Sequence, residues 1–150
     1  MSKVINHQFF FAHPPEIVWE YLTKSELMEL WLMKNNFQPI VGFEFQFRTS
    51  PVPSKNFDGV FYCKVLEIVP FKKLSYTWCS GPGNGEITLD SVVVWKLEAR
   101  EKGTELFLEH SGFAGKENLS MYEGLAHGWV EKLQNINKLL NIAQHGNTNA

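Results

Sequence analysis

The stretch LSMYEGLAHGWVEKLQNINKLLNIAQ, residues 119–144, predicts one long amphipathic helix. On a helical wheel that turns by about 100° per residue, its large apolar residues fall in one stripe and its charged residues fall outside. Ser120 and Glu123 have the spacing of a capping box, which predicts that the helix begins at Met121. The other segments of the chain must cover so wide an apolar face. The stripe consists of Tyr122, Leu125, Ala126, Trp129, Leu133, Ile136 and Leu140.

The segments before this helix alternate between apolar and polar residues, with the period of two that is typical of β-strands. Phe43, Phe45 and Phe47 give the clearest case, since polar residues separate them. In a later strand, the pattern places Ile87 on the same buried face as Trp95. The predicted strands are residues 4–11, 43–47, 58–69, 74–79, 87–98 and 106–110.

Two short helices are predicted between the first and second strands. Pro14 and Pro15 favour a helix start, and Ser25 is a suitable N-cap for the second helix. The closely spaced hairpins that follow imply antiparallel pairing. We therefore predict an α+β fold in which a curved six-stranded antiparallel sheet wraps around the long helix. Residues 1–150 form one domain in this prediction, with residues 145–150 as a frayed tail.

Composition excludes several classes of function. The net charge is −2 without a basic cluster, which argues against binding to nucleic acid. No apolar run approaches the roughly 20 residues that cross a bilayer, and no secretory signal is recognisable, so we expect a cytoplasmic protein without membrane insertion. Cys63 and Cys79 are expected to be free thiols there. The histidines lack metal-ligand spacing, so neither a metal nor another cofactor is predicted.

Several phrases of the sequence, taken in order, resemble a known family. They are HPPEIVW at 13–19, LW at 30–31, residues 70–78, GT at 103–104, HSGF at 110–113 and GW at 128–129. This order is similar to the homologues of the activator of heat-shock-protein-90 ATPase, within the START-like or SRPBCC superfamily. The resemblance implies a helix-grip fold, often with a hydrophobic cavity between sheet and helix. Members of the superfamily bind lipids, polyketides or other apolar molecules, and some are cyclases.

Nine residues are the candidates for lining such a cavity. Core packing is the competing interpretation for each single aromatic ring, because large aromatics are commonly buried without touching a ligand. Together, however, they would surround whatever space a concave sheet leaves beneath the helix. The candidates are Trp31, Phe45, Tyr76, Trp78, Trp95, Leu108, His110, Phe113 and Trp129.

His110 is the most informative polar candidate, because alternation places it on the helix-facing side of its strand. A buried histidine needs hydrogen-bond partners, and a structural bond to the following loop is the favoured interpretation. Orientation of a ligand or a role as general base are the alternatives. His127, in contrast, falls on the polar side of the long helix, and we expect it to be solvated.

Three functions follow from these observations. The first is a small cytoplasmic protein that binds an apolar or aromatic molecule and exists as a monomer or weak dimer. The second is an interaction module whose partner is a chaperone. The third is an enzyme of the polyketide-cyclase type, with His110 as base, although no catalytic pair is recognisable in the sequence.

Overall fold

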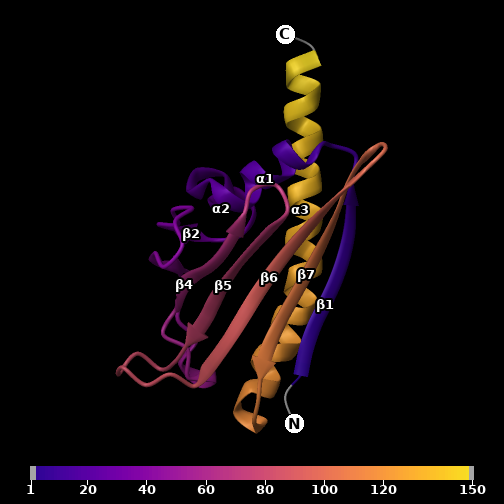
Figure 1. The fold of residues 1–150 in the computed structure, drawn as a ribbon. Helices are drawn as coiled ribbons and strands as arrows, with labels where there is room; N and C mark the ends of the chain where they lie inside the picture. Colours follow the sequence, from indigo (N-terminus) through magenta and orange to yellow (C-terminus); the bar gives the residue numbers. More distant parts are fainter. Residues whose placement is uncertain (1–2, 149–150) are drawn as a thin grey trace.

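The computed structural model describes residues 3–148, with side chains described up to residue 142 except that of residue 117. One antiparallel sheet with the strand order β1-β7-β6-β5-β4-β3-β2 forms a single curved layer (Figure 1). The strands are β1 (Lys3–Phe11), β2 (Lys34–Asn35), β3 (Glu44–Arg48), β4 (Val60–Val69), β5 (Lys73–Ser80), β6 (Leu89–Arg100) and β7 (Gly103–Phe113).

The long helix α3 (Leu119–Thr148) crosses one face of this sheet and is flanked at its C-terminal half by two short helices (Figure 1). These are α1 (Pro15–Thr23), which has a proline in its first turn, and α2 (Ser25–Trp31). Two 3₁₀ turns, η1 (Pro53–Lys55) and η2 (Lys116–Asn118), precede β4 and α3 respectively. The predicted α+β architecture of a curved antiparallel sheet around the C-terminal helix is confirmed.

The prediction of six strands was wrong by one. The seventh strand, β2, has two residues and pairs with the end of β3. A strand of two residues is too short to show an alternating pattern, so periodicity could not predict it. The strand predicted over residues 87–98 begins at Leu89 instead, and Ile87, which precedes it, is 49% exposed.

The start of α3 also differs from the prediction. Because η2 runs directly into the helix, the amide of Asn118 already bonds to the carbonyl of Gly115, and that of Leu119 to Lys116. Within the described side chains no capping bond joins Ser120 and Glu123, and the helix begins at Leu119 rather than Met121. The helix continues past the predicted Gln144 to Thr148, and residues 149–150 of the predicted tail lie outside the described residues.

The apolar stripe of α3 faces the sheet as predicted. Trp129, Leu133, Ile136 and Leu140 are buried in the core, and the other three residues of the stripe are partly buried against it. Strand β1 holds the helix from one side, because His7 Nε2 donates to the Ala126 carbonyl at 2.8 Å. His127 lies on the opposite side and is exposed, as expected.

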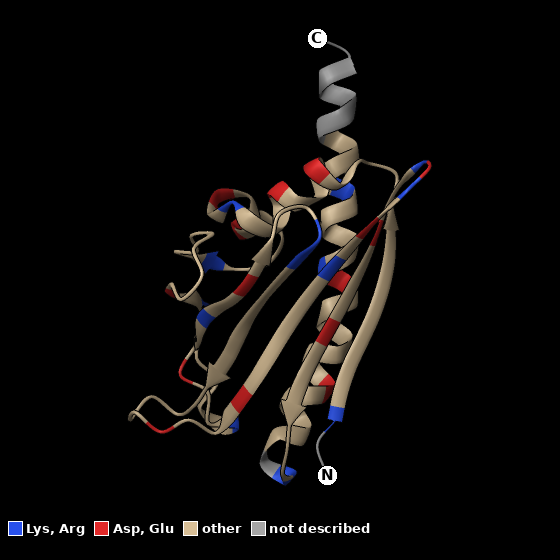
Figure 2. Ribbon diagram, in the orientation of Figure 1, with Lys and Arg blue, Asp and Glu red and all other residues tan. Residues whose placement is uncertain are grey.

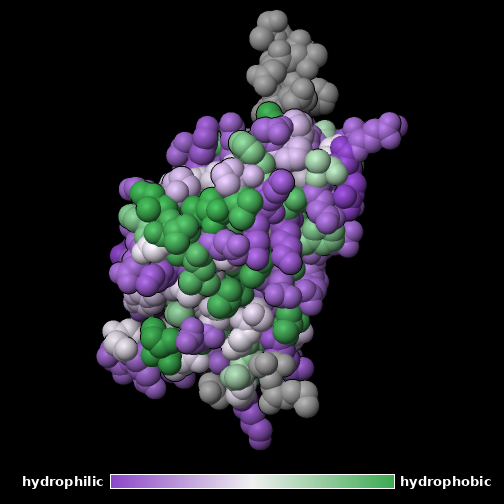
Figure 3. Space-filling view, viewed as in Figure 1, coloured by the Kyte–Doolittle hydropathy of each residue, from purple (hydrophilic) through white to green (hydrophobic). Residues whose placement is uncertain are grey.

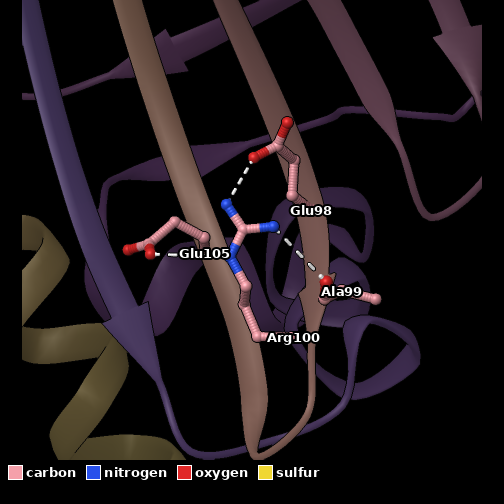
Figure 4. A network of polar contacts seen from close by, with 4 residues as sticks. All are labelled: Glu98, Ala99, Arg100 and Glu105. Atoms are coloured by element: carbon pink, nitrogen blue, oxygen red, sulfur yellow. Dashed lines mark hydrogen bonds and ion pairs between the residues drawn. The ribbon is translucent and has the colours of Figure 1, made fainter.

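Residues of both charges are interspersed along the strands of the sheet (Figure 2). Glu98 and Glu105 are directly paired across β6 and β7, an arrangement in which like charges repel. The guanidinium of Arg100 lies between them, 2.6 Å from Glu98 and 3.9 Å from Glu105, and offsets this repulsion (Figure 4). None of the helices over residues 3–148 is both long and apolar enough to span a bilayer.

Candidate functional site

A buried chain of hydrogen bonds joins α3 to three adjacent strands. The indole Nε1 of Trp129 donates to His110 Nδ1 at 3.1 Å, and His110 Nε2 lies 2.8 Å from the hydroxyl of Ser91. Ser91 in turn donates to the backbone carbonyl of Trp78. The residues come from α3, β7, β6 and β5 in that order, and all four side chains are at most 2% exposed.

The direction of this chain decides the protonation state of His110. Since an indole nitrogen only donates, Nδ1 must accept, and the imidazole proton must lie on Nε2 and point to Ser91. Burial lowers the pKa of His110 to about 3, because an imidazolium ion would lose its hydration there. The imidazole is therefore neutral near pH 7. Its one lone pair is already occupied by Trp129, which leaves none for taking a proton from a substrate.

The favoured structural interpretation of His110 agrees with this geometry, although its partners are Ser91 and Trp129 rather than the following loop. Sequence reasoning did not single out Ser91. The available signal was a serine at an inward position of a strand whose other inward residues, such as Leu89 and Val93, are apolar.

All nine sequence-predicted residues lie in the core between α3 and the sheet, and none is more than 3% exposed. Their rings contact one another, so that Trp129 lies 5.4 Å from Trp78 and 5.5 Å from Trp95, measured between ring centroids. Trp31 then lies edge-on to Trp95 at 6.0 Å. Side chains of the protein therefore occupy the centre of the space beneath α3.

One polar group in this centre lacks a partner. The indole nitrogens of Trp31, Trp95 and Trp129 donate to the Tyr21 carbonyl, the Tyr76 hydroxyl and His110 respectively. In contrast, Trp78 Nε1 is buried and has no acceptor among the described residues. A buried donor without an acceptor costs about 1–3 kcal/mol of stability. An acceptor placed within hydrogen-bond distance of this N–H would remove that cost.

A pocket of about 410 Å³ lies where α3 begins, at the lower end of the molecule in Figure 1. It is more enclosed than the pockets on the outer face of the sheet. Ser80 lines the pocket and is the next inward residue of β5 after Trp78. The pocket therefore lies about two residues along the strand from Trp78. We call it the end pocket; its lining residues are Ser54, Lys55, Asn56, Ser80, Thr88, Asn118, Ser120 and Met121.

The end pocket was not predicted. Its residues come from η1 and the residue after it, the end of β5 and the β5–β6 connection, and η2 with the first turn of α3, which are far apart in the sequence. Over the part of the chain that the structure describes, no three His, Cys, Asp or Glu side chains are grouped so that they could hold a metal ion. The donors around the pocket and the Trp78 N–H favour binding of a molecule by hydrogen bonds and burial.

Comparison with known proteins gives a consistent result. A family model described as "Activator of Hsp90 ATPase homolog 1-like protein" matches residues 12–141. Protein MLL2253 from Mesorhizobium loti is 35% identical, with a TM-score of 0.82 over 93% of this chain and 97% of that protein. No curated protein matches this chain.

Two further solved structures have a similar fold. Protein BH1534 from Bacillus halodurans is 25% identical to this chain, with a TM-score of 0.71 over 91% of this chain and 95% of the BH1534 chain. The Aha1 dimer from Colwellia psychrerythraea is 20% identical to this chain, with a TM-score of 0.72 over 90% of this chain and 93% of the Aha1 chain.

Proposed function

Because this chain belongs to the family of activator of Hsp90 ATPase homolog 1-like proteins, which have the START-like (SRPBCC) fold, we propose that it binds a small apolar molecule between α3 and the sheet. The molecule carries a hydrogen-bond acceptor. In this proposal the nine core residues predicted from the sequence contact it or move to admit it. They are Trp31, Phe45, Tyr76, Trp78, Trp95, Leu108, His110, Phe113 and Trp129.

The observation that carries the proposal is the N–H group of Trp78, which is buried without an acceptor among the described residues. The other three central indoles have partners, so the missing acceptor is specific to this position. A ligand oxygen at this N–H would remove the cost of the unpaired donor. Burial of the ligand's apolar part would add about 25 cal/mol for each Å² removed from water.

The end pocket supplies the opening for such a molecule. Its volume of about 410 Å³ is within the range of roughly 300–1,000 Å³ that is usual for small-molecule sites. Met121, which lines it, is partly buried against the core, so the pocket adjoins apolar side chains. An apolar molecule can therefore enter beside the first turn of α3 and displace Met121 rather than the whole helix.

Titration with an uncharged apolar alcohol tests this proposal. Dodecan-1-ol and 2-naphthol each provide an apolar body and one acceptor oxygen. We expect the indole N–H signal of Trp78 in a ¹H–¹⁵N spectrum to move further than the signals of Trp31 and Trp95, because only this group gains a new acceptor.

The matched variants are Trp78→Phe, which removes the donor and keeps an aromatic ring, and Trp95→Phe, which makes the same change at an indole already bonded to Tyr76. Loss of one neutral hydrogen bond corresponds to about a 2- to 12-fold weaker affinity for the first variant. The second variant keeps the Trp78 donor, so its affinity should fall less than that of the first. Absence of saturable binding by both alcohols would contradict the proposal.

A second candidate function is docking of a chaperone on the outer face of the sheet. Apolar side chains gather there over β4 and the connection between β2 and β3 (Figure 3). We define the outer patch as Ile40, Val41 and Leu66, which are 53%, 61% and 43% exposed. Leu66 is exposed because a β-bulge interrupts the register between Val65 and Glu67, and the Gly42 amide bonds to the Val65 carbonyl, which brings Val41 beside it. Exposed apolar groups in one patch are typical of interaction sites.

We expect the double variant Val41→Lys, Leu66→Lys to bind a purified Hsp90-type chaperone at least about tenfold more weakly, because two apolar contacts become charged. Ile142→Lys, an equally drastic change at a residue 69% exposed on α3, is the control. Calorimetry and the chaperone's ATPase rate are the measurements. If the natural protein neither binds the chaperone nor stimulates its ATPase, this candidate function is rejected. Size-exclusion chromatography then shows whether a second copy of this chain occupies the outer patch instead.

The proposal includes a cytoplasmic location. The thiols of Cys63 and Cys79 are both free, which fits a reducing compartment. Their pKa values are raised by burial, Cys79 to about 11, so neither is suited to be a nucleophile near pH 7.

A further inference from the structure

From the end pocket we infer that the ligand is an acid: besides the acceptor oxygen that meets Trp78 Nε1, the apolar molecule carries one carboxylate, which binds among Lys55, Ser80 and the hydroxyl groups beside them. This inference rests on the proposed function, and it adds the chemical class of the ligand's second polar group.

The lining of the end pocket is rich in donors. Lys55 contributes an ammonium group, and serine, threonine and asparagine side chains make up most of the remainder. None of the lining residues is acidic. Two members are engaged in holding the fold, since Asn118 Nδ2 donates to the carbonyls of Thr88 and Ala114, and Thr88 donates to the Ser80 carbonyl. The side chains of Lys55 and Ser80 have no hydrogen-bond partner among the described residues.

Ser80 is the member that points to a ligand rather than to a solvated surface. It is 2% exposed and lies on the inward face of β5, in line with Tyr76 and Trp78. Its cross-strand partner, Leu89, is a buried apolar residue. A buried hydroxyl beside a pocket is a donor held ready for an acceptor.

The loop that carries Lys55 is coupled to the aromatic core. Val52 and Phe57 bridge the two ends of η1 through backbone bonds of 2.9 and 3.3 Å. Phe57 is buried and lies 4.9 Å from Phe61, whose ring lies 4.4 Å from that of Trp78. One run of contacts therefore joins the loop of Lys55 to the indole ring of Trp78, which fixes the position of this loop relative to the aromatic core.

The charge of the pocket determines which polar end it fits. One ammonium group matches one negative charge, and a carboxylate has two oxygens that can accept from Lys55 and from hydroxyl groups at the same time. A neutral alcohol would use only part of these donors. A dianionic phosphate would leave one of its charges without a partner.

Calorimetric titration of the full chain with dodecanoate and dodecan-1-ol tests the inference, because these probes differ only in the polar end. A hydrogen bond to a charged group contributes about 1.5–3 kcal/mol, so we expect dodecanoate to bind at least about tenfold more tightly than dodecan-1-ol does. Lys55→Gln should reduce dodecanoate affinity to about that of the alcohol, and Ser80→Ala should weaken dodecanoate more than dodecan-1-ol. Lys102→Gln, in the β6–β7 turn at the other end of the sheet, should change neither affinity.

The outcomes separate the two proposals. Equal binding of acid and alcohol, or a Lys55→Gln variant that keeps the preference for the acid, overturns the inference and leaves the proposed function standing. Failure of both probes overturns the proposed function and the inference with it. Acetate is the third probe. If acetate binds as tightly as dodecanoate, the pocket binds carboxylates without an apolar chain, and the assignment to an apolar acid is overturned.

Discussion

Replacement of His110 by alanine is expected to lower the free energy of unfolding by about 3–5 kcal/mol. The change leaves the indole N–H of Trp129 without an acceptor and the Ser91 hydroxyl without its imidazole partner, in a region where all of these groups are at most 2% exposed. It also opens a cavity, because the imidazole contacts the rings of Phe113 and Trp78 at centroid distances of 4.6 and 5.4 Å. Urea unfolding followed by tryptophan fluorescence measures the loss.

Two other variants divide this loss into its parts. His110→Gln keeps one donor and one acceptor at the position, so it should recover part of the stability that alanine loses. Ser91→Ala removes a single hydroxyl and should cost less, about 1–3 kcal/mol. A loss below about 1 kcal/mol for His110→Ala would show that the chain of hydrogen bonds does not hold α3 to the sheet.

Mild acid is expected to destabilise the protein through the same residue. The pKa of His110 is lowered from 6.5 to about 3 by burial, so the unfolded chain binds a proton between these pH values and the folded chain does not. The stability contributed by the neutral imidazole is therefore complete above pH 6.5 and is lost progressively as the pH falls toward 3. Between pH 8 and pH 5 the loss from this group is about 2 kcal/mol.

The difference between the natural protein and His110→Gln isolates this contribution, because glutamine does not titrate and every other group is shared. Unfolding free energies measured at several pH values should converge as the pH is lowered, with the natural protein losing about 2 kcal/mol more than the variant by pH 5. Parallel pH profiles of the two proteins would contradict the assignment of acid sensitivity to His110.

The hydrogen bonds of His110 also bear on catalysis. A general base needs a lone pair and access to substrate, and here the lone pair accepts from Trp129 while the side chain is fully buried. The geometry thus favours binding over the cyclase hypothesis. It also explains why a histidine is useful at this point: a neutral imidazole is both donor and acceptor, so it can link an indole on α3 to a hydroxyl on β6.

Much of the fold was predictable from local periodicity. The stripe of α3 from Tyr122 to Leu140 repeats with the helical period, and the alternation around Phe45 and Trp95 assigns one face of each strand to the core. Such patterns suffice because burial of an apolar face depends on neighbours only a few residues apart. The same reasoning placed His110 on the helix-facing side of β7.

The amino-acid sequence alone therefore determined the curved sheet, the gripped helix and the buried aromatic set, since each of these follows from which side chains avoid water. The tertiary structure alone decided which buried polar groups meet. Ser91 completes the bonds of His110, and Lys55 shares a pocket with Ser80 and Ser120. Over the residues that the structure describes, the indole N–H of Trp78 meets no acceptor. These groups lie on different strands and loops, and a hydrogen bond requires donor and acceptor within about 3 Å, a condition set by strand register and helix placement rather than by spacing along the chain.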